Sequence, residues 1–223
     1  MKFVYYGHAC FLLDTGNEKL LFDPFLTGNS QAAITAEEAA CDYILLSHAH
    51  GDHFGDAEAI EKRTGAAVVA IPEVLGLFKD GVKTPYPMNL GGSVRLPFGT
   101  VTMTPALHSS GVPGGTACGF LIRFNSGINI YYAGDTALFG DMKLIGAKAP
   151  IHYAVLPIGD NYTMGPEDAA EAAVFLGARN VIPIHYNTWP VISQDPADFA
   201  EKAGAAGISA LTVAPGEAVT LDQ

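Results

Sequence analysis

The sequence predicts a single α/β domain, residues 1–223, with two sheet layers and outer helices. Short strand-like runs alternate with helical segments in both halves of the chain, and no linker rich in Pro, Gly or Ser separates the halves. The 223 residues are 49% hydrophobic and 16% charged, which fits a compact globular protein with a sizeable core. The same composition excludes a disordered tail, a coiled coil and a collagen-like repeat.

The first part of the chain predicts strands at residues 3–6, 11–13 and 20–22, separated by turns such as Asp14-Thr15-Gly16-Asn17. Such close spacing is typical of an antiparallel meander. The apolar run 43–46 predicts a buried strand, and residues 56–64 predict a helix because Ala57, Ile60 and Glu61 recur at helical spacing. A strand at 67–71, stopped by Pro72, and a short helix at 73–78 complete this part.

The rest of the chain repeats the pattern. Strands are predicted at 94–96, 101–104, 120–124, 128–132, 153–156, 181–184 and 211–214. Asn125-Ser126-Gly127 is a hairpin signal between two of them. Helices are predicted at 167–176, where Pro166 occupies the favoured first turn, and at 197–203.

Charge and cysteine usage restrict the partners and the compartment. The 12 Lys and Arg residues against 23 Asp and Glu give a formal net charge of −11, and the longest basic run is Lys62-Arg63. We therefore expect a small-molecule substrate, no nucleic acid and no membrane, while self-association into a homo-oligomer stays open. The cysteines match neither a disulfide pattern nor a thiolate zinc site, and they predict a reducing compartment: Cys10, Cys41 and Cys118.

The chain has no apolar run long enough to span a membrane, since such a run needs ~18 residues. The apolar start at residues 1–6 is interrupted by Gly7-His8 and lacks a small-residue cleavage site. The expectation is a mature chain that starts at Met1 and stays in the cytoplasm.

One cluster dominates the candidate chemistry: His48, His50, Asp52 and His53, directly after a predicted strand. In an extended chain, residues i and i+2 point the same way, so His48 and His50 can converge on one cation. Asp52 and His53 then turn toward a second position. Imidazole and carboxylate ligands together suit zinc, iron or manganese.

Three further residues share one placement. His108, Asp135 and His185 each fall at the end of a predicted strand, where α/β folds carry their chemistry. A lone His or Asp at a strand end is more often a turn residue, but together these three bring the candidate ligands to seven.

The seven residues resemble the signature of the metallo-β-lactamase superfamily, and the resemblance covers essentially the whole chain. Four further segments look like its branch of uncharacterised metal-dependent hydrolases: Gly7-His8-Ala9-Cys10, Asp23-Pro24-Phe25, Met88-Asn89-Leu90-Gly91-Gly92 and Thr163-Met164-Gly165-Pro166. That branch is similar to the ascorbate-6-phosphate lactonases and, more distantly, to N-acyl-phosphatidylethanolamine phospholipase D. The resemblance implies a four-layer αββα sandwich with a dinuclear site at one edge.

The resemblance also implies a division of the ligands. His48, His50 and His108 would bind the first metal, Asp52, His53 and His185 the second, and Asp135 would bridge. Two divalent metal ions per chain are expected; zinc is the preferred candidate, and manganese, iron and nickel are alternatives. A metal-bridging hydroxide would attack a small ester, lactone or phosphodiester, and Asp52 would orient it and take its proton.

Two weaker candidates lie in turns. His8, between the first two predicted strands, is a candidate to contact substrate or to deliver a proton to the leaving group. Asp23 ends the third predicted strand and could hydrogen-bond a ligand histidine from behind.

Two other functions stay open from the sequence alone. One is a non-catalytic metal-binding or sensor module of the same fold, and the other is a nuclease-type phosphodiesterase, which the acidic charge disfavours. An oxygen-reducing di-iron enzyme is disfavoured because that branch typically has Glu where this chain has His50.

Overall fold

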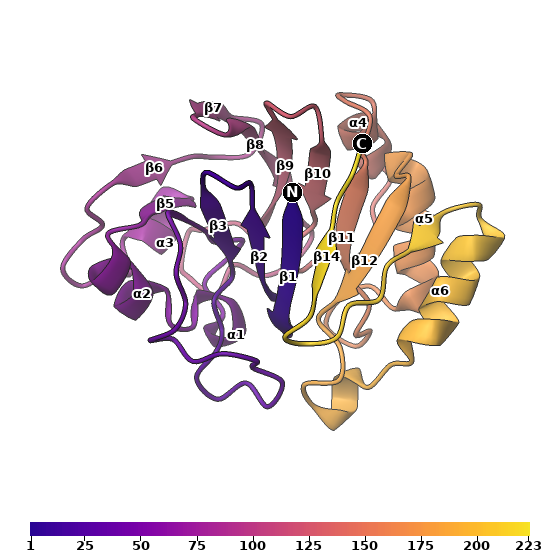
Figure 1. Cartoon of the computed structure of the whole chain (residues 1–223), viewed down its shortest axis with the longest axis horizontal. Coiled ribbons are helices and arrows are strands. Elements are labelled where there is room, and N and C mark those ends of the chain that lie inside the picture. Colours follow the sequence, from indigo (N-terminus) through magenta and orange to yellow (C-terminus); the bar gives the residue numbers. More distant parts are fainter. The chain divides into compact units, whose positions relative to one another are not determined.

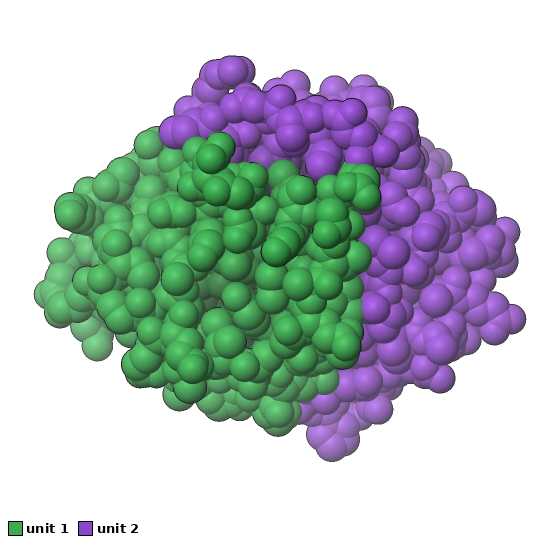
Figure 2. Space-filling view, in the orientation of Figure 1, with its two compact units in different colours: residues 1–92, 109–117, 213–222 green, residues 93–108, 118–212, 223 purple.

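The computed structural model describes residues 1–223, which divide into two compact units (Figure 2). Unit 1 comprises residues 1–92, 109–117 and 213–222, and unit 2 comprises residues 93–108, 118–212 and 223. Each unit contains one seven-stranded mixed sheet. The single domain stays a prediction.

The sheet of unit 1 has the strand order β14-β1-β2-β3-β4-β5-β6 (Figure 1). Strands β1, β2 and β3 pair antiparallel, which confirms the predicted meander, and β3 to β6 pair parallel. Rings of Phe3, Phe11 and Phe22 stack across the first three strands, with centroids 5.0 and 4.3 Å apart. The strands are β1 (Lys2–Gly7), β2 (Cys10–Asp14), β3 (Lys19–Phe22), β4 (Tyr43–Leu45), β5 (Ala67–Ala70), β6 (Pro85–Pro87) and β14 (Ala218–Thr220).

The helices of unit 1 are short: α1 (Gly51–Phe54), α2 (Ala57–Thr64) and α3 (Pro72–Leu75). Helix α2 buries the three residues whose spacing predicted it, and it ends at Gly65, whose φ of 70° is the left-handed conformation that glycine adopts without strain. Its buried Glu61 accepts a hydrogen bond from the backbone N–H of Lys83, so this carboxylate has a structural partner.

The sheet of unit 2 has the strand order β13-β12-β11-β10-β9-β8-β7. Strands β7 to β10 pair antiparallel in sequence order, and β10 to β13 pair parallel. Strands β8, β10, β11 and β12 therefore all end at the same edge of this sheet. The strands are β7 (Ser93–Leu96), β8 (Gly99–Pro105), β9 (Cys118–Phe124), β10 (Asn129–Tyr132), β11 (Tyr153–Pro157), β12 (Asn180–Ile184) and β13 (Ser209–Ala210).

Three α-helices and one 3₁₀ turn complete unit 2: α4 (Met142–Gly146), α5 (Pro166–Leu176), η1 (Pro190–Ile192) and α6 (Pro196–Ala205). The helices α4 to α6 share one hydrophobic core with side chains of β9 to β12. Helix α5 contributes the fully buried Ala169, Ala172 and Ala173, whose small side chains allow its backbone to approach its neighbours closely. None of the helices in either unit combines the length and the hydropathy that crossing a membrane requires.

The elements agree with the sequence prediction except near the C-terminus and at four short segments that the prediction lacks: α1, β6, α4 and η1. The strand predicted at 211–214 is wrong: the structure places the short β13 before it and β14 after it. Strand β6 contains Pro85 and Pro87, which cannot donate to a ladder, so its sequence carries no strand signal. Helix α4 was also absent from the prediction, because its five residues are too few for a periodic pattern.

Candidate metal centre

Unit 1 gathers its candidate ligands at one edge of its sheet. Strands β1 and β3 both run antiparallel to β2, and β4 runs parallel to β3, so all three end at the same edge. His8 follows β1, Asp23 follows β3, and the segment from Ser47 to His53 follows β4. His8 and Asp23 have φ values of 56° and 38°, in the left-handed region that non-glycine residues seldom adopt. Such backbone outliers are concentrated at functional sites.

His48 and His50 converge, as their i, i+2 spacing requires. His48 Nε2 and His50 Nδ1 are 2.9 Å apart. The other nitrogen of His50, Nε2, is 3.2 Å from the hydroxyl of Ser109. The loop 109–117 packs tightly there, because a Cβ at Gly111 would lie 2.7 Å from Cδ2 of His50. Sequence reasoning did not identify Ser109, although it directly follows the candidate ligand His108.

A buried carboxylate, that of Asp23, contacts the candidate ligands from behind. It accepts a hydrogen bond from His53 Nδ1 at 2.7 Å and from the backbone N–H of Ser47 at 2.8 Å. The Ser47 hydroxyl also donates to Asp23 and lies 2.9 Å from His48 Nδ1. Hydrogen bonds to one ring nitrogen fix the tautomer and leave the other nitrogen, Nε2, available as a ligand. The sequence indicated Asp23 for this role but gave no signal for Ser47.

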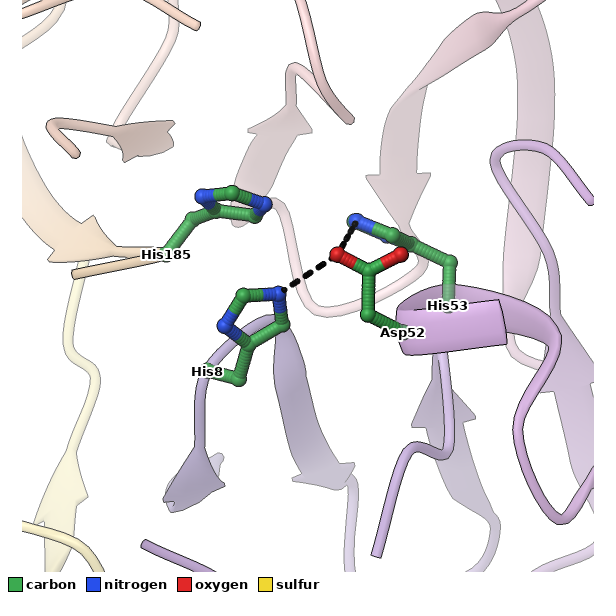
Figure 3. A group of neighbouring side chains, drawn as sticks. All are labelled: His8, Asp52, His53 and His185. Atoms are coloured by element: carbon green, nitrogen blue, oxygen red, sulfur yellow. Dashed lines mark hydrogen bonds and ion pairs between the residues drawn. The ribbon is translucent and has the colours of Figure 1, made fainter. Parts of the chain in front are cut away.

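The short helix α1 carries Asp52 and His53, and Figure 3 shows both beside His8. The Asp52 carboxylate lies 3.2 Å from His8 Nε2 and 3.9 Å from His53 Nε2. His8 and His53 are fully buried, whereas the Asp52 side chain is 26% exposed. Asp52 is therefore the member of this group that water can reach.

Unit 2 brings its three candidate ligands together by itself. His108, Asp135 and His185 follow β8, β10 and β12, which end at the same sheet edge. The Asp135 carboxylate is 3.0 Å from His185 Nε2 and 3.7 Å from His108 Nε2. Gly134 and His185 have φ values of 62° and 56°, so the chain turns sharply where these side chains are presented.

The cysteines take no part in these clusters. All three are buried and free of disulfides. Burial raises the pKa of the Cys10 thiol well above its usual value, and the nearby Asp23 carboxylate raises it further. Burial also raises the pKa of Cys41 to about 11. The Cys10 and Cys41 thiols therefore stay protonated at neutral pH, so these two residues lack the thiolate that binds metals or attacks substrates.

The donor set fits divalent transition metals. Each unit supplies imidazole nitrogens next to a carboxylate. In unit 1, one nitrogen of His53 is hydrogen-bonded to Asp23, and one nitrogen each of His48 and His50 lies within hydrogen-bond distance of a serine hydroxyl. Within unit 1, Asp23, His48 and His53 have ligand atoms that all lie within 4.8 Å of one another. Imidazole with carboxylate is a ligand set typical of zinc and of catalytic iron or manganese.

Comparisons with known proteins agree with this chemistry. The family model of the beta-lactamase superfamily domain matches residues 11–186. A UPF0173 metal-dependent hydrolase of Shouchella clausii is 47% identical over 213 residues, covering 89% of this chain and 91% of the relative. The chain belongs to this family of metal-dependent hydrolases.

Further relatives of this hydrolase extend the comparison. A UPF0173 metal-dependent hydrolase of Thermus thermophilus is 46% identical over 221 residues, which cover 98% of each chain. The solved structure of Igni18, a metallo hydrolase from the archaeon Ignicoccus hospitalis, has 36% identity and a TM-score of 0.92, and the match covers 100% of this chain and 98% of that one. The two mixed sheets and their helices are thus the α/β metallo-β-lactamase sandwich fold that the sequence resemblance implied.

Proposed function

We propose that this hydrolase binds two divalent cations, zinc first, and cleaves a small ester, lactone or phosphodiester. The strongest argument for the proposal is that the imidazole rings of His48 and His53 in unit 1 are already held by hydrogen bonds to one of their two nitrogens. Asp23 and Ser47 hold His53 and His48, so that ligand nitrogens are oriented before any ion arrives. Such a prepared ligand set is typical of a catalytic centre that must keep its geometry.

In the proposed division, His48, His50 and His108 would hold the first ion, Asp52, His53 and His185 would hold the second, and Asp135 would serve both. This division rests on the resemblance of the sequence to the superfamily signature. The bound ions would supply Lewis acidity and lower the pKa of water toward neutrality. Within unit 2, the Asp135 carboxylate lies beside both His108 and His185, so it could serve ligand sites that include either histidine.

The remaining steps belong to side chains of unit 1. Asp52 orients the attacking water and accepts its proton. The oxygen then forms a bond to the carbonyl carbon or to phosphorus, and the bond to the leaving oxygen breaks. His8 lies 3.2 Å from Asp52, so the proton can pass to His8 and from there to the leaving oxygen. Water is consumed: an ester or phosphodiester yields an acid and an alcohol, and a lactone yields a single hydroxy acid.

Metal content and turnover together test the proposal. After dialysis against zinc or manganese, the protein should retain close to two ions per chain by plasma mass spectrometry, and it should hydrolyse members of an ester, lactone and phosphodiester panel. Asp52→Ala should lose turnover and weaken one ion preferentially. Asp168→Ala replaces an exposed carboxylate on α5 and is the matched control.

Three results would contradict the proposal. Retention of no more than about one ion would refute the dinuclear centre. Two ions without turnover on any substrate would favour a sensor module. Efficient RNA cleavage that weakens steeply with salt would favour a nuclease.

A further inference from the structure

Four exposed apolar side chains of unit 2 lie in segments that follow its strands at the ligand edge. Among the exposed large hydrophobic residues of this unit, Leu144 and Val174 lie on α-helices, and the other four lie in the segments that leave the ends of β8, β11 and β12, with Val191 in the 3₁₀ turn η1. We name these four the apolar rim; their exposed fractions are 55% for Leu107, 56% for Tyr162, 37% for Trp189 and 51% for Val191. Exposed apolar side chains concentrated in one place mark binding surfaces, whereas scattered ones need no explanation.

The loops that carry the rim are joined to those that carry the candidate ligands. We call residues 106–108, 133–141, 158–165 and 185–195 the edge loops. The Thr136 hydroxyl accepts from the backbone N–H of Leu107 at 2.9 Å, and the Thr136 carbonyl accepts from Met164 N–H at 3.0 Å. Gln194 Nε2 donates to the carbonyl of Gly159 at 3.3 Å. The rim is therefore a fixed part of the ligand edge.

The edge loops contain no lysine or arginine, although the chain has 12 such residues. Lys143 comes shortly after the 133–141 loop, but its ammonium group lies over the ring of Phe175, 4.2 Å from the ring centroid. The ligand-bearing loops of unit 1, residues 8–9, 23–42, 46–56 and 109–117, also lack lysine and arginine. Arg63 reaches one of them from α2, but its guanidinium donates to the carbonyls of Ala36 and Ala39.

Charge and exposure together define what the rim can bind. An anionic group remote from the reacting bond, such as a sugar phosphate or a carboxylate, would find no cationic side chain in these loops, and the chain is already strongly negative. An apolar group would cover exposed side chains and gain the free energy of burial, roughly 25 cal/mol per Å². The rim thus favours substrates that are uncharged away from the bond being cleaved.

We propose that the apolar rim selects esters or lactones whose non-reacting part is an uncharged alkyl or aryl group. This inference deepens the proposed function and rests on it. Trp189 and Val191 are the specificity-determining residues in the 185–195 loop, and Leu107 and Tyr162 extend the surface from the neighbouring loops. A substrate carrying a second anionic group is disfavoured by the same loops.

A binding experiment tests the rim without turnover. Trp189 is the single tryptophan of the chain, so its fluorescence reports on the rim directly. A γ-lactam with a hexyl substituent should change the emission of metal-free and metal-loaded protein saturably. A lactam whose chain ends in a carboxylate should bind at least about tenfold more weakly. Val191→Lys should reverse this preference, whereas Val174→Ala, an exposed apolar position on α5, should leave it unchanged.

A kinetic experiment uses γ-lactones with methyl, butyl and hexyl substituents. For the metal-loaded protein we expect kcat/KM to rise about two- to fourfold per added methylene, because each buried methylene contributes a fixed increment of transfer free energy. Trp189→Ala should reduce this dependence, mainly through KM, and should affect the hexyl lactone more than the methyl one.

The two proposals fail in different ways. Saturable lactam binding without hydrolysis of any lactone or ester supports the rim and contradicts the hydrolytic function. Hydrolysis that is independent of chain length, equal use of the carboxylate-bearing lactone, or an equal effect of Val174→Ala would overturn the rim and leave the hydrolytic function standing.

Discussion

Asp23 connects strand β3 to two histidines of the candidate centre. Its carboxylate is fully buried and receives three hydrogen bonds, from His53, from the Ser47 hydroxyl and from the Ser47 backbone. We expect Asp23→Asn to lower metal affinity about 10- to 100-fold, the usual effect of removing a group that orients a ligand. Chelator competition measures the affinity. Asp80→Asn, which removes an exposed carboxylate paired with Lys62, should leave it unchanged; equal affinity in both variants would refute the role of Asp23.

His8 is the second residue whose removal is informative. Its side chain is fully buried and its φ is 56°, so alanine would leave a cavity and strain the backbone. Asparagine tolerates this conformation better. We expect His8→Asn to lower turnover about 10²- to 10⁴-fold, the usual contribution of general acid catalysis, with metal content retained. Loss of the ions along with turnover would show instead that His8 supports the metal site.

His152 controls part of the pH dependence of stability. Burial lowers its pKa below the usual value of 6.5, and Arg179 lowers it further. The neutral ring accepts a hydrogen bond from the backbone N–H of Asn129 through Nδ1 at 3.0 Å. Because the folded state binds this proton less readily than the unfolded state, the stability contribution is complete above pH ~6.5 and is lost as pH falls through the folded pKa.

Urea unfolding between pH 7 and pH 5 checks this linkage. His152→Gln keeps an acceptor but does not titrate. As pH falls, the free energy of unfolding of His152→Gln should decrease less steeply than that of the wild type. The two slopes should differ by up to about 1.4 kcal/mol per pH unit. Parallel slopes for the two proteins would show that His152 does not contribute.

At the scale of elements, part of the connection between β8 and β9 belongs to unit 1 and holds the candidate ligand His50 in place. Residues 109–117 pack against His50, and Gly111 has a φ of 72° with no room for a Cβ beside that ring. Gly114, in the same connection, has a φ of 77° with nothing within 4 Å of its Cβ position. Both positions require a conformation that alanine adopts with strain, but only one touches the candidate ligand.

This pair of glycines separates backbone strain from ligand displacement. Gly111→Ala should destabilise the fold more than Gly114→Ala, and only Gly111→Ala should weaken metal binding, because its Cβ displaces His50. Urea unfolding and chelator competition on both variants measure the two effects. Equal metal affinity in the two variants would contradict the contact.

The sequence predicted most elements because their signals are local. The meander of β1 to β3 and the amphipathic α2 follow from apolar spacing within a few residues. Strand β14 pairs with β1 from the other end of the chain, so its three residues gain strand structure from a partner that local patterns do not reveal.

The same distinction applies to the site. The i, i+2 spacing of His48 and His50 is readable because both residues lie on one extended segment. Ser47 and Ser109 are defined by contacts with neighbouring rings, and serine is too common in loops to mark such a role by itself. The apolar rim could not be predicted either, because its four residues are far apart in the sequence and only the fold brings their segments to one sheet edge of unit 2.

At the scale of the whole molecule, the metal ions should be part of the stability. Ions that bind the folded chain and not the unfolded chain stabilise it by about 2.7 kcal/mol per site at a hundredfold excess over Kd. For a chain of this length, that corresponds to a Tm increase of about 5–10 °C per site. Thermal scans at increasing free zinc measure the increase, with His50→Ala as the comparison. An unchanged Tm would contradict binding to the folded state.

Strand β14 has a consequence for synthesis on the ribosome. Besides pairing with β2, β1 pairs with β14, and neighbouring backbone bonds also reach residues 216–221: Tyr5 N–H donates to Glu217, Gly216 N–H donates to Tyr5, and Leu221 N–H donates to Met1. Until β14 has been translated, β1 has an open edge, the kind of backbone that pairs with other chains. During synthesis β1 therefore leaves the ribosome well before the strand that completes its pairing, and in that interval its edge is open to association with other chains.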